Sequence, residues 1–439
     1  GTFVAQATSV PSSASSPALD VPTYALPPQT HARAPNIAPA PGTLLMANGA
    51  PDVRLFPARP LARAFRRAIE HRGRNLLTSN DPCGHPRLRA ELATMLARTR
   101  GIAATPDTLM VTRSIEQGID LVARTLLAPG DVVAVEAFGY PPAWSVLRLA
   151  GARLVPLPLD HDGLDVDALE SLLLHERIRA VFLTPHHQFP TTSVMSQDRR
   201  ARLARLALAH GFAIIEDDYD HEFHYAGKPV LPLAASSGRA NVVYVGSLSN
   251  LLAPGISTGF VVAPPPVFER LAGLRAASDA RGDAAVECAI AELFEDGELL
   301  RHVRRMRRIY ATRRDALAES LKRRLGGALE FAVPDGGMAI WTRVDDGIDL
   351  DAWSLAGERK RVRFHGARPY DFFGYARPFV RLGFSYHDER ELDEAVARMA
   401  SALATSRPVR SAPSFRAPHA ALPVRRRAAG SAPKTAAQD

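Results

Sequence analysis

Short apolar runs alternate with helical patterns of apolar residues from Leu44 onward. Helical spacing over Glu116–Leu127 and Arg199–His210 places helices between such runs. Strands that are apolar on both faces and separated by helices predict an α/β fold, with a mostly parallel seven-stranded sheet covered by helices on both faces. The seven runs are Leu109–Thr112, Asp131–Glu136, Arg153–Leu157, Ala180–Thr184, Ala213–Glu216, Asn241–Gly246 and Gly259–Ala263.

The same pattern changes along the chain and predicts five segments. From about residue 266 the short runs give way to long Arg-rich helices such as Glu298–Leu321 and then to a shorter α+β section. We predict a large α/β domain over 80–265, a small α+β domain over 266–404, and an N-terminal segment over 44–79 that packs with the small domain. The Pro-, Ala- and Ser-rich part of 1–43 is typical of a linker, and we expect a further domain before it. Residues 405–439 have few large apolar side chains and are expected to be disordered.

Composition and charge narrow the class of protein. The chain has 439 residues, 46% of them hydrophobic, and a formal net charge of +8. Most of that charge lies after residue 406, where seven Lys or Arg residues accompany one Asp, so the folded body is close to neutral. The two cysteines, Cys83 and Cys288, do not indicate a disulfide framework, and no apolar run reaches the length of a membrane span. We expect a cytoplasmic protein with no membrane partner. The basic tail is either a contact for nucleic-acid phosphates or a solubilising extension.

Polar and aromatic residues gather directly after the predicted strands, where ligands bind in parallel sheets. A helix start favours an anion, an aromatic ring stacks on a flat ligand, and a carboxylate and a phenol bind polar ring atoms. Together they predict a pocket for a phosphorylated heteroaromatic ring. The residues are Arg113, Ser114 and Ile115 at a helix start, Tyr140, His187, Asp217 and Tyr219, and then Ser247, Ser249 and Asn250.

At these residues the chain resembles the fold-type I aminotransferases, and among them the effector domain of the MocR/GabR-type transcriptional regulators. The resemblance covers roughly residues 44–400 in the right order, and its combination of motifs is specific although each motif alone is weak. It implies a pyridoxal-phosphate transferase fold, a homodimer, and a winged-helix DNA-binding domain before the linker, of which Gly1–Val4 resembles the last residues. The matching runs are Asp81–Arg89, Thr184–Ser196, Ile214–Tyr225, Tyr244–Phe260, Arg304–Arg314 and Val380–Phe384.

The resemblance also implies a role for each candidate residue. Asp217 matches the carboxylate that pairs with the pyridine nitrogen, and Tyr219 matches the phenol that binds the ring's 3′-oxygen. Arg381 matches the arginine that holds a substrate carboxylate in a bidentate pair. Tyr140 matches the aromatic residue that stacks on the ring, and His187 belongs to the run that lines the other side of the ring. Ser247 and Ser249 match hydroxyls near the phosphate.

The chain departs from the family where the cofactor is anchored. Asn250 stands in place of the lysine that binds the cofactor covalently, and an amide nitrogen is neither a nucleophile nor a proton shuttle. Ser257 replaces an arginine that clamps the phosphate, Ser79 replaces a tyrosine that reaches it from the partner subunit, and Thr192 replaces the glycine of a Pro-Thr-Gly turn. Arg113-Ser114-Ile115 replaces the small residues of the phosphate cradle, so Arg113 could supply the missing charge, fill the cradle or point to solvent. We expect transamination to be lost and pyridoxal phosphate to bind weakly and non-covalently, or not at all.

Three hypotheses follow for function. The favoured one is a dimeric effector domain of a MocR/GabR-like regulator, with a degenerate cofactor site that senses a small amino-acid-like or carboxylate ligand through Arg381. The alternative is an aminotransferase-family enzyme that uses the cofactor without a lysine. The third is a structural dimeriser with an empty pocket.

Overall fold

The computed structural model describes residues 39–47, 49–78, 81–227, 230–236, 238–279 and 282–405. Most of the predicted linker, nearly all of the predicted basic tail, and Ser79 lie outside these residues. Within the described part of the chain, no helix combines the length and the apolar character that a bilayer crossing requires.

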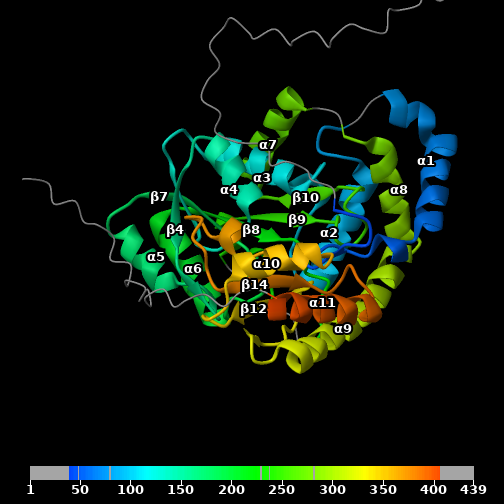
Figure 1. Ribbon diagram of the computed structural model, residues 1–439. Helices are drawn as coiled ribbons and strands as arrows, with labels where there is room; N and C mark the ends of the chain where they lie inside the picture. Colours follow the sequence, from blue (N-terminus) through cyan, green and yellow to red (C-terminus); the bar gives the residue numbers. More distant parts are fainter. Residues whose placement is uncertain are drawn as a thin grey trace, which may run out of the picture. The chain divides into compact units, whose positions relative to one another are not determined.

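A seven-stranded sheet is the centre of the larger layered body (Figure 1). The strand order is β2-β10-β9-β8-β7-β3-β4, and only β10 runs antiparallel to its neighbours. The predicted α/β class and the mostly parallel seven-stranded sheet are therefore confirmed. The strands are β2 (Leu109–Thr112), β3 (Val132–Glu136), β4 (Arg153–Leu157), β7 (Ile178–Leu183), β8 (Ala213–Asp218), β9 (Val242–Ser247) and β10 (Gly259–Val262).

Two apolar cores lie on opposite faces of this sheet. Successive strand residues point to opposite faces, so Val133 and Val135 enter one core while Val132 and Ala134 enter the other. This double burial explains why the strands are apolar throughout. One face is covered by α3 (Ile115–Leu126), α4 (Pro141–Leu149) and α7 (Pro265–Ser278), and the other by α2 (Pro86–Arg100), α5 (Val166–Leu173) and α6 (Gln197–His210).

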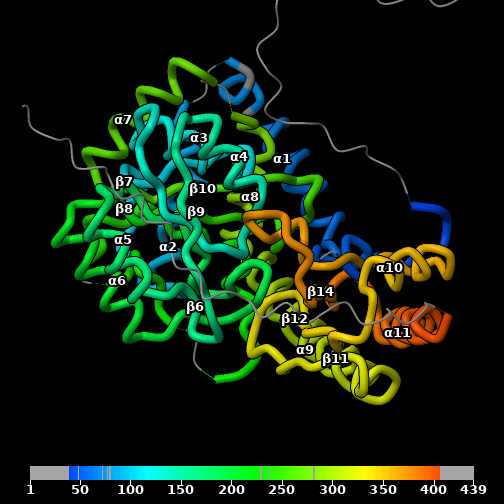
Figure 2. The backbone as a smooth tube through the Cα atoms, turned by 60° about the vertical axis from the view of Figure 1, so that its left-hand side comes forward, coloured from blue at the N-terminus to red at the C-terminus, as the bar shows by residue number. Residues whose placement is uncertain are grey.

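A third core lies beside a three-stranded sheet of order β11-β12-β14. The strands are β11 (Leu329–Glu330), β12 (Ala339–Val344) and β14 (Phe379–Gly383), and the helices packed against them are α9 (Glu298–Leu325), α10 (Leu350–Arg359) and α11 (Glu389–Thr405). Figure 2 shows α10 and α11 beside β14, at the opposite end of the molecule from α5 and α6. The helix α9 serves both parts, because Leu299 and Val303 belong to the larger core and Met306 to the smaller one.

The first described residues join the smaller core. Strand β1 (Leu44–Leu45) pairs in parallel with β13 (Val362–Arg363), and Met46 is fully buried among the small-core residues. By contrast, α1 (Ala58–Thr78) packs against α8 (Ala284–Glu295), with Ala68 and Leu76 buried against Cys288. Two small two-stranded elements complete the secondary structure, β5 (Leu159–Asp160) with β6 (Gly163–Leu164) and β1 with β13.

A buried ion pair fastens this N-terminal segment to α9. The Nη2 of Arg313 lies 3.0 Å from Asp52 Oδ2, and its Nη1 donates to the Ser385 carbonyl at 2.6 Å. The Asp52 N–H donates to the Tyr310 hydroxyl at 3.1 Å. Burial by itself would raise the pKa of Asp52, but hydrogen bonds from Arg54 and Arg313 lower it overall.

Replacing Arg313 tests this fastening. We expect Arg313→Leu to lower the free energy of unfolding by about 3–5 kcal/mol, because it leaves a buried carboxylate short of a partner. Since the folded-state pKa of Asp52 is depressed, the difference from wild type is present above the ordinary value of 3.8 and shrinks as the pH falls below it. Urea unfolding at several pH values measures it. Arg304→Leu, an exposed arginine on the same helix, is the control and should change stability by less than about 0.5 kcal/mol; equal losses in the two variants would contradict the expectation.

Candidate functional site

A cavity of about 450 Å³ lies at the carboxyl ends of the large-sheet strands, where the polar strand-end residues converge. Strands β8 and β9 present Asp217, Tyr219 and Ser247, and the turn after β9 presents Ser249 and Asn250. The small domain closes the cavity with Arg381 of β14. The described lining residues are Ala47, Gly49, Ala50, Ser114, Ile115, Glu116, Tyr140, Phe189, Asp217, Tyr219, Ser247, Ser249, Asn250, Pro254, Ser257, Tyr370 and Arg381.

Two of the predicted residues have side chains outside this lining. Arg113 turns to the surface, where its Nε lies 3.0 Å from Asp279 Oδ2 and more than half of its side chain is exposed. It therefore neither fills the predicted cradle nor supplies charge to it. His187 is buried behind the cavity, with its Nδ1 2.7 Å from Asp220 Oδ1. Only the carbonyl of His187 meets a cavity residue, by accepting the Tyr219 hydroxyl at 2.9 Å.

Asp217 is the most unusual group in the cavity. The residue is 2% exposed and its Oδ1 has no hydrogen-bond partner. Burial, together with the negative charges of Asp218, Glu116, Glu136 and Asp220, holds the pKa of Asp217 well above its ordinary value. An orphaned acid oxygen at this place suits a ligand that brings a donor, such as a protonated ring nitrogen.

Asn250 cannot anchor a ligand covalently, and its side chain is already engaged. Its Nδ2 donates to the Tyr219 carbonyl at 3.0 Å, which ties the turn after β9 to the end of β8. Nearby, the Ser249 N–H donates to the Ser247 hydroxyl at 3.0 Å. These bonds make the loop a self-supporting turn in which Asn250 has a structural role.

The end of the cavity at the start of α3 carries a carboxylate. Ser114 caps α3 by accepting the Gln117 N–H at 3.2 Å, and Glu116 lies in the first turn. Glu116 accepts the Tyr140 hydroxyl at 2.6 Å and lines the cavity. A carboxylate in the first turn already occupies the region where the helix dipole favours an anion. Among the described lining residues, the sole cation is Arg381, which belongs to the small domain.

The lining fits pyridoxal phosphate at one end of the ring only. Asp217 suits the ring nitrogen, but the α3 end offers hydroxyls from Ser114 and Ser257 beside the carboxylate of Glu116, and no cation for a phosphate dianion. None of the lining residues that the structure describes is a lysine. The residues therefore do not fit a covalently held, charge-clamped cofactor.

Two aromatic residues to which the strand-end pattern gave no role, Phe189 and Tyr370, also line the cavity. Phe189 meets Tyr140 and Tyr370 edge-on, with ring centroids 5.3 Å apart in both pairs, and Arg381 lies over the Phe189 ring at 4.9 Å. Phe189 was within reach of the sequence, because it follows His187 and Gln188 after β7. Glu116 likewise adjoins the predicted helix start, whereas Tyr370 comes from a small-domain turn with no local signal.

Two backbone positions explain further sequence choices. A β-carbon on Gly49 would stand 2.7 Å from Arg381 Nη2, so glycine here lets the backbone pass close to the guanidinium in its present position. Thr192 adopts φ 60°, in the left-handed region that favours glycine, which is the residue expected in its turn.

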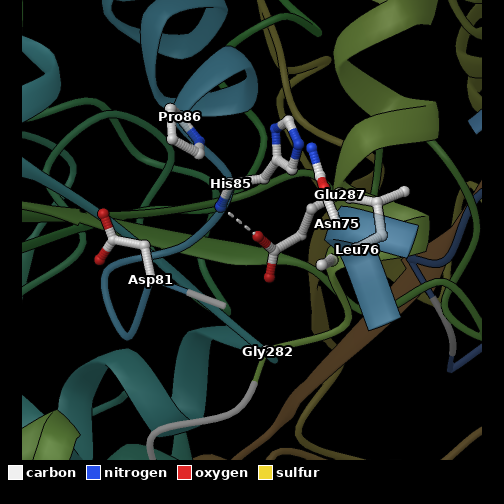
Figure 3. Close-up of a pocket in the computed structure, with 8 residues that line it drawn as sticks. Asn75, Leu76, Asp81, His85, Pro86, Gly282 and Glu287 are labelled. Carbon is white, nitrogen blue, oxygen red and sulfur yellow. Dashed lines mark hydrogen bonds between the residues drawn. The ribbon is translucent and has the colours of Figure 1, made fainter. Parts of the chain in front are cut away.

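A second cavity, of about 230 Å³, lies where α1, α2 and α8 meet (Figure 3). Glu287 points into it and accepts the His85 N–H at 2.6 Å. Burial raises the pKa of Glu287. None of the predicted site residues lines this cavity.

The orphaned state of Asp217 can be tested through stability. A raised folded-state pKa means that the favourable contribution is complete below the ordinary value of 3.8 and is lost as the pH rises through the folded-state value. We expect Asp217→Asn to stabilise the ligand-free protein by about 1–3 kcal/mol at pH 8, and by less at pH 5. Urea unfolding at the two pH values measures the gain, with the exposed Asp107→Asn as control. A destabilisation of equal size at both pH values would contradict this account.

Comparisons with known proteins place the chain in one family. The model of aminotransferase class I and II matches residues 44–399. The 2-aminoadipate transaminase of Thermus thermophilus is 30% identical over 83% of this chain and 90% of its own length. The probable rhizopine catabolism regulatory protein MocR of Rhizobium meliloti is 28% identical over 81% of this chain and 71% of its own length. Further relatives carry the name of HTH-type transcriptional regulators.

The solved structures agree with these relatives. The α-aminoadipate aminotransferase LysN from Thermus thermophilus, complexed with N-(5′-phosphopyridoxyl)-L-leucine, has a TM-score of 0.77 and 28% identity, covering 83% of this chain and 92% of that one. The resemblance drawn from the sequence motifs, to fold-type I aminotransferases and MocR-type regulators alike, is confirmed. The chain belongs to the aminotransferase class I and II family, on the fold that its pyridoxal-phosphate-dependent members share.

Proposed function

We propose that this chain is the effector-binding domain of a MocR-like transcriptional regulator, and that its cavity binds a small carboxylate or amino acid without covalent attachment. The observation that carries the proposal is Arg381. The residue is 4% exposed, lies in the cavity, and its Nε has no hydrogen-bond partner. Among the described residues, no carboxylate pairs with it.

A buried guanidinium without an anion is costly, and a ligand carboxylate would relieve that cost through a bidentate pair. Asp217 stands across the cavity as an acceptor for a donor group on the same ligand. An α-amino acid carries both functions, a carboxylate for Arg381 and an ammonium for Asp217. The carboxylate of Glu116 at the α3 end disfavours a ligand with a second strong negative charge there.

The position of the two groups supports a sensing role. Arg381 belongs to the small domain and Asp217 to the large one, so a ligand that contacts both would favour a closed arrangement. We propose that this closure, in a homodimer, is passed through the linker to a DNA-binding winged-helix domain. The support is the set of regulator relatives, which are longer than the region they share with this chain.

An enzyme that uses pyridoxal phosphate non-covalently is the second candidate, favoured by the retained Asp217 and by the aminotransferase relatives. It differs from the first in requiring the cofactor to bind and amino groups to be transferred.

A test for covalent attachment of the cofactor distinguishes both candidate functions from that of an ordinary aminotransferase. After incubation with pyridoxal phosphate and reduction by borohydride, we expect no mass increase on any cavity peptide of the wild type, because Asn250 cannot react. Asn250→Lys should gain a reduced adduct at residue 250 by peptide mapping. A reducible adduct in the wild-type cavity would contradict the proposal. Amino transfer to 2-oxoglutarate above the rate of free cofactor would favour the enzyme instead.

Ligand binding by Arg381 is measured by calorimetry with L-alanine, L-glutamate, L-2-aminoadipate and succinate. We expect at least one amino acid to bind the wild type, and Arg381→Ala to weaken its affinity at least about 30-fold, since removing one side of a buried charge pair costs about 2–5 kcal/mol. The control is Arg343→Ala, an exposed arginine on the neighbouring strand β12. Absence of heat with every amino acid and with pyridoxal phosphate would favour a purely structural dimeriser.

A further inference from the structure

Four histidines cluster behind the ligand cavity, at the ends of β7 and β8. His186 and His187 follow β7, and His221 and His224 follow β8. The ring centroid of His186 lies 4.3 Å from that of His187 and 4.2 Å from that of His221. The rings of His187 and His224 are stacked, with their centroids 6.0 Å apart. None of the four lines the ligand cavity.

Three of these histidines bury nitrogens that have no partner. His186 is 2% exposed, His187 1% and His224 8%. Both ring nitrogens of His186 and of His224, and the Nε2 of His187, lack a hydrogen bond. A buried polar nitrogen that has no hydrogen-bond partner is unfavourable. Three neighbouring imidazoles with this deficit suit one shared partner better than an apolar core.

Three of the histidines bring ring nitrogens close together. One ligand nitrogen from each of His186, His187 and His224 can be chosen so that all three lie within 4.8 Å of one another. Asp220 accepts the Nδ1–H of His187, which leaves the lone pair on Nε2. A carboxylate behind a ligating histidine is the usual support in metal sites.

We propose that His186, His187 and His224 form a binding site for a divalent transition metal ion of the zinc type. Three neutral imidazoles suit Zn²⁺, Co²⁺, Ni²⁺ and Cu²⁺ and do not suit Ca²⁺ or Mg²⁺, which need oxygen ligands. Zn–N bonds of about 2.0–2.1 Å in a tetrahedron set the ligand nitrogens about 3.3 Å apart, so binding draws the nitrogens, now within 4.8 Å of one another, closer by at most about 1.5 Å. The fourth position is left to water.

The site stands where the two domains meet. His224 forms an isolated β-bridge with Gly336, and the Gly337 N–H donates to the Phe223 carbonyl at 2.8 Å. A β-carbon on Gly336 would collide with His187 Nε2, so the glycine brings small-domain backbone against the cluster. A metal here would hold the loops after β7 and β8 together against this small-domain turn.

The metal would also affect the ligand cavity. The carbonyl of His187 accepts the hydroxyl of Tyr219, which lines the cavity, so fixing His187 fixes the orientation of that phenol. The proposal rests on the histidine cluster alone and stands whether or not the cavity binds an amino acid.

The experiment uses the full chain, freed of metal by chelator and titrated with Zn²⁺ by calorimetry and with Co²⁺ by visible absorbance. We expect one tight site per chain and the d–d bands of a tetrahedral Co²⁺ complex. The double variant His186→Ala/His224→Ala should lose the bands and bind Zn²⁺ at least 100-fold more weakly. The exposed His161→Ala and His210→Ala are matched controls and should keep the wild-type affinity.

A second variant keeps the proposal testable if the double variant does not fold. Asp220→Asn retains all three ligands and removes only the support of His187, so Zn²⁺ affinity should fall about 10–100-fold. Circular dichroism and the melting temperature without metal check its fold, and added Zn²⁺ should raise the melting temperature of the wild type more than that of the variant. Absence of Co²⁺ bands in the wild type, or wild-type affinity in the folded double variant or in Asp220→Asn, would overturn the proposal.

Discussion

Burial of the central sheet on both faces is the constraint from which the rest of the molecule follows. Val132 and Ala134 enter one core and Val133 and Val135 the other, so the middle of such a strand offers little room for polar side chains that contact a ligand. Polar chemistry is therefore displaced to the strand ends, and parallel strands bring those ends to one edge. Asp217, Tyr219 and Asn250 meet there although they come from two different strands. This convergence buries several carboxylates close together. Burial and the neighbouring negative charges raise the pKa of Asp217 as a result.

This constraint also explains how much of the molecule the sequence could predict. A strand that is buried on both faces appears in the sequence as a continuous apolar run. The sheet and the residues that follow its strands could therefore be predicted from the sequence. The direction of a side chain after a strand was not. Arg113 is next to the capping residue Ser114, yet its partner, Asp279, is a residue from the distant end of α7. His187 turned inward because Asp220, supplied by another strand end, holds its ring.

Residues that reach the cavity from the small domain were harder still to predict, and only family resemblance pointed to Arg381. Tyr370 lies in a short turn whose place depends on the packing of a separate core, and nothing near it in the chain signals a site. Glu116 is adjacent to predicted residues, but its role is to place a negative charge in the cavity. That role depends on Tyr140, which comes from the next strand end and donates a hydrogen bond to it. Local patterns thus predict which backbone segments form the site, whereas tertiary packing decides which charges face its interior.

Charge in the cavity is divided between the two domains. The large domain contributes the carboxylates of Asp217 and Glu116, and the small domain contributes the cation Arg381. A cofactor with a phosphate dianion would need that polarity reversed at the α3 end, whereas an amino acid matches it. Asn250 donates to the Tyr219 carbonyl, and the Tyr219 hydroxyl donates to the His187 carbonyl, so hydrogen bonds connect Asn250 through Tyr219 to the histidine cluster. Asn250 therefore has a connecting role in this structure. Tyr219 thus links the wall of the ligand cavity to the loop that carries His186 and His187.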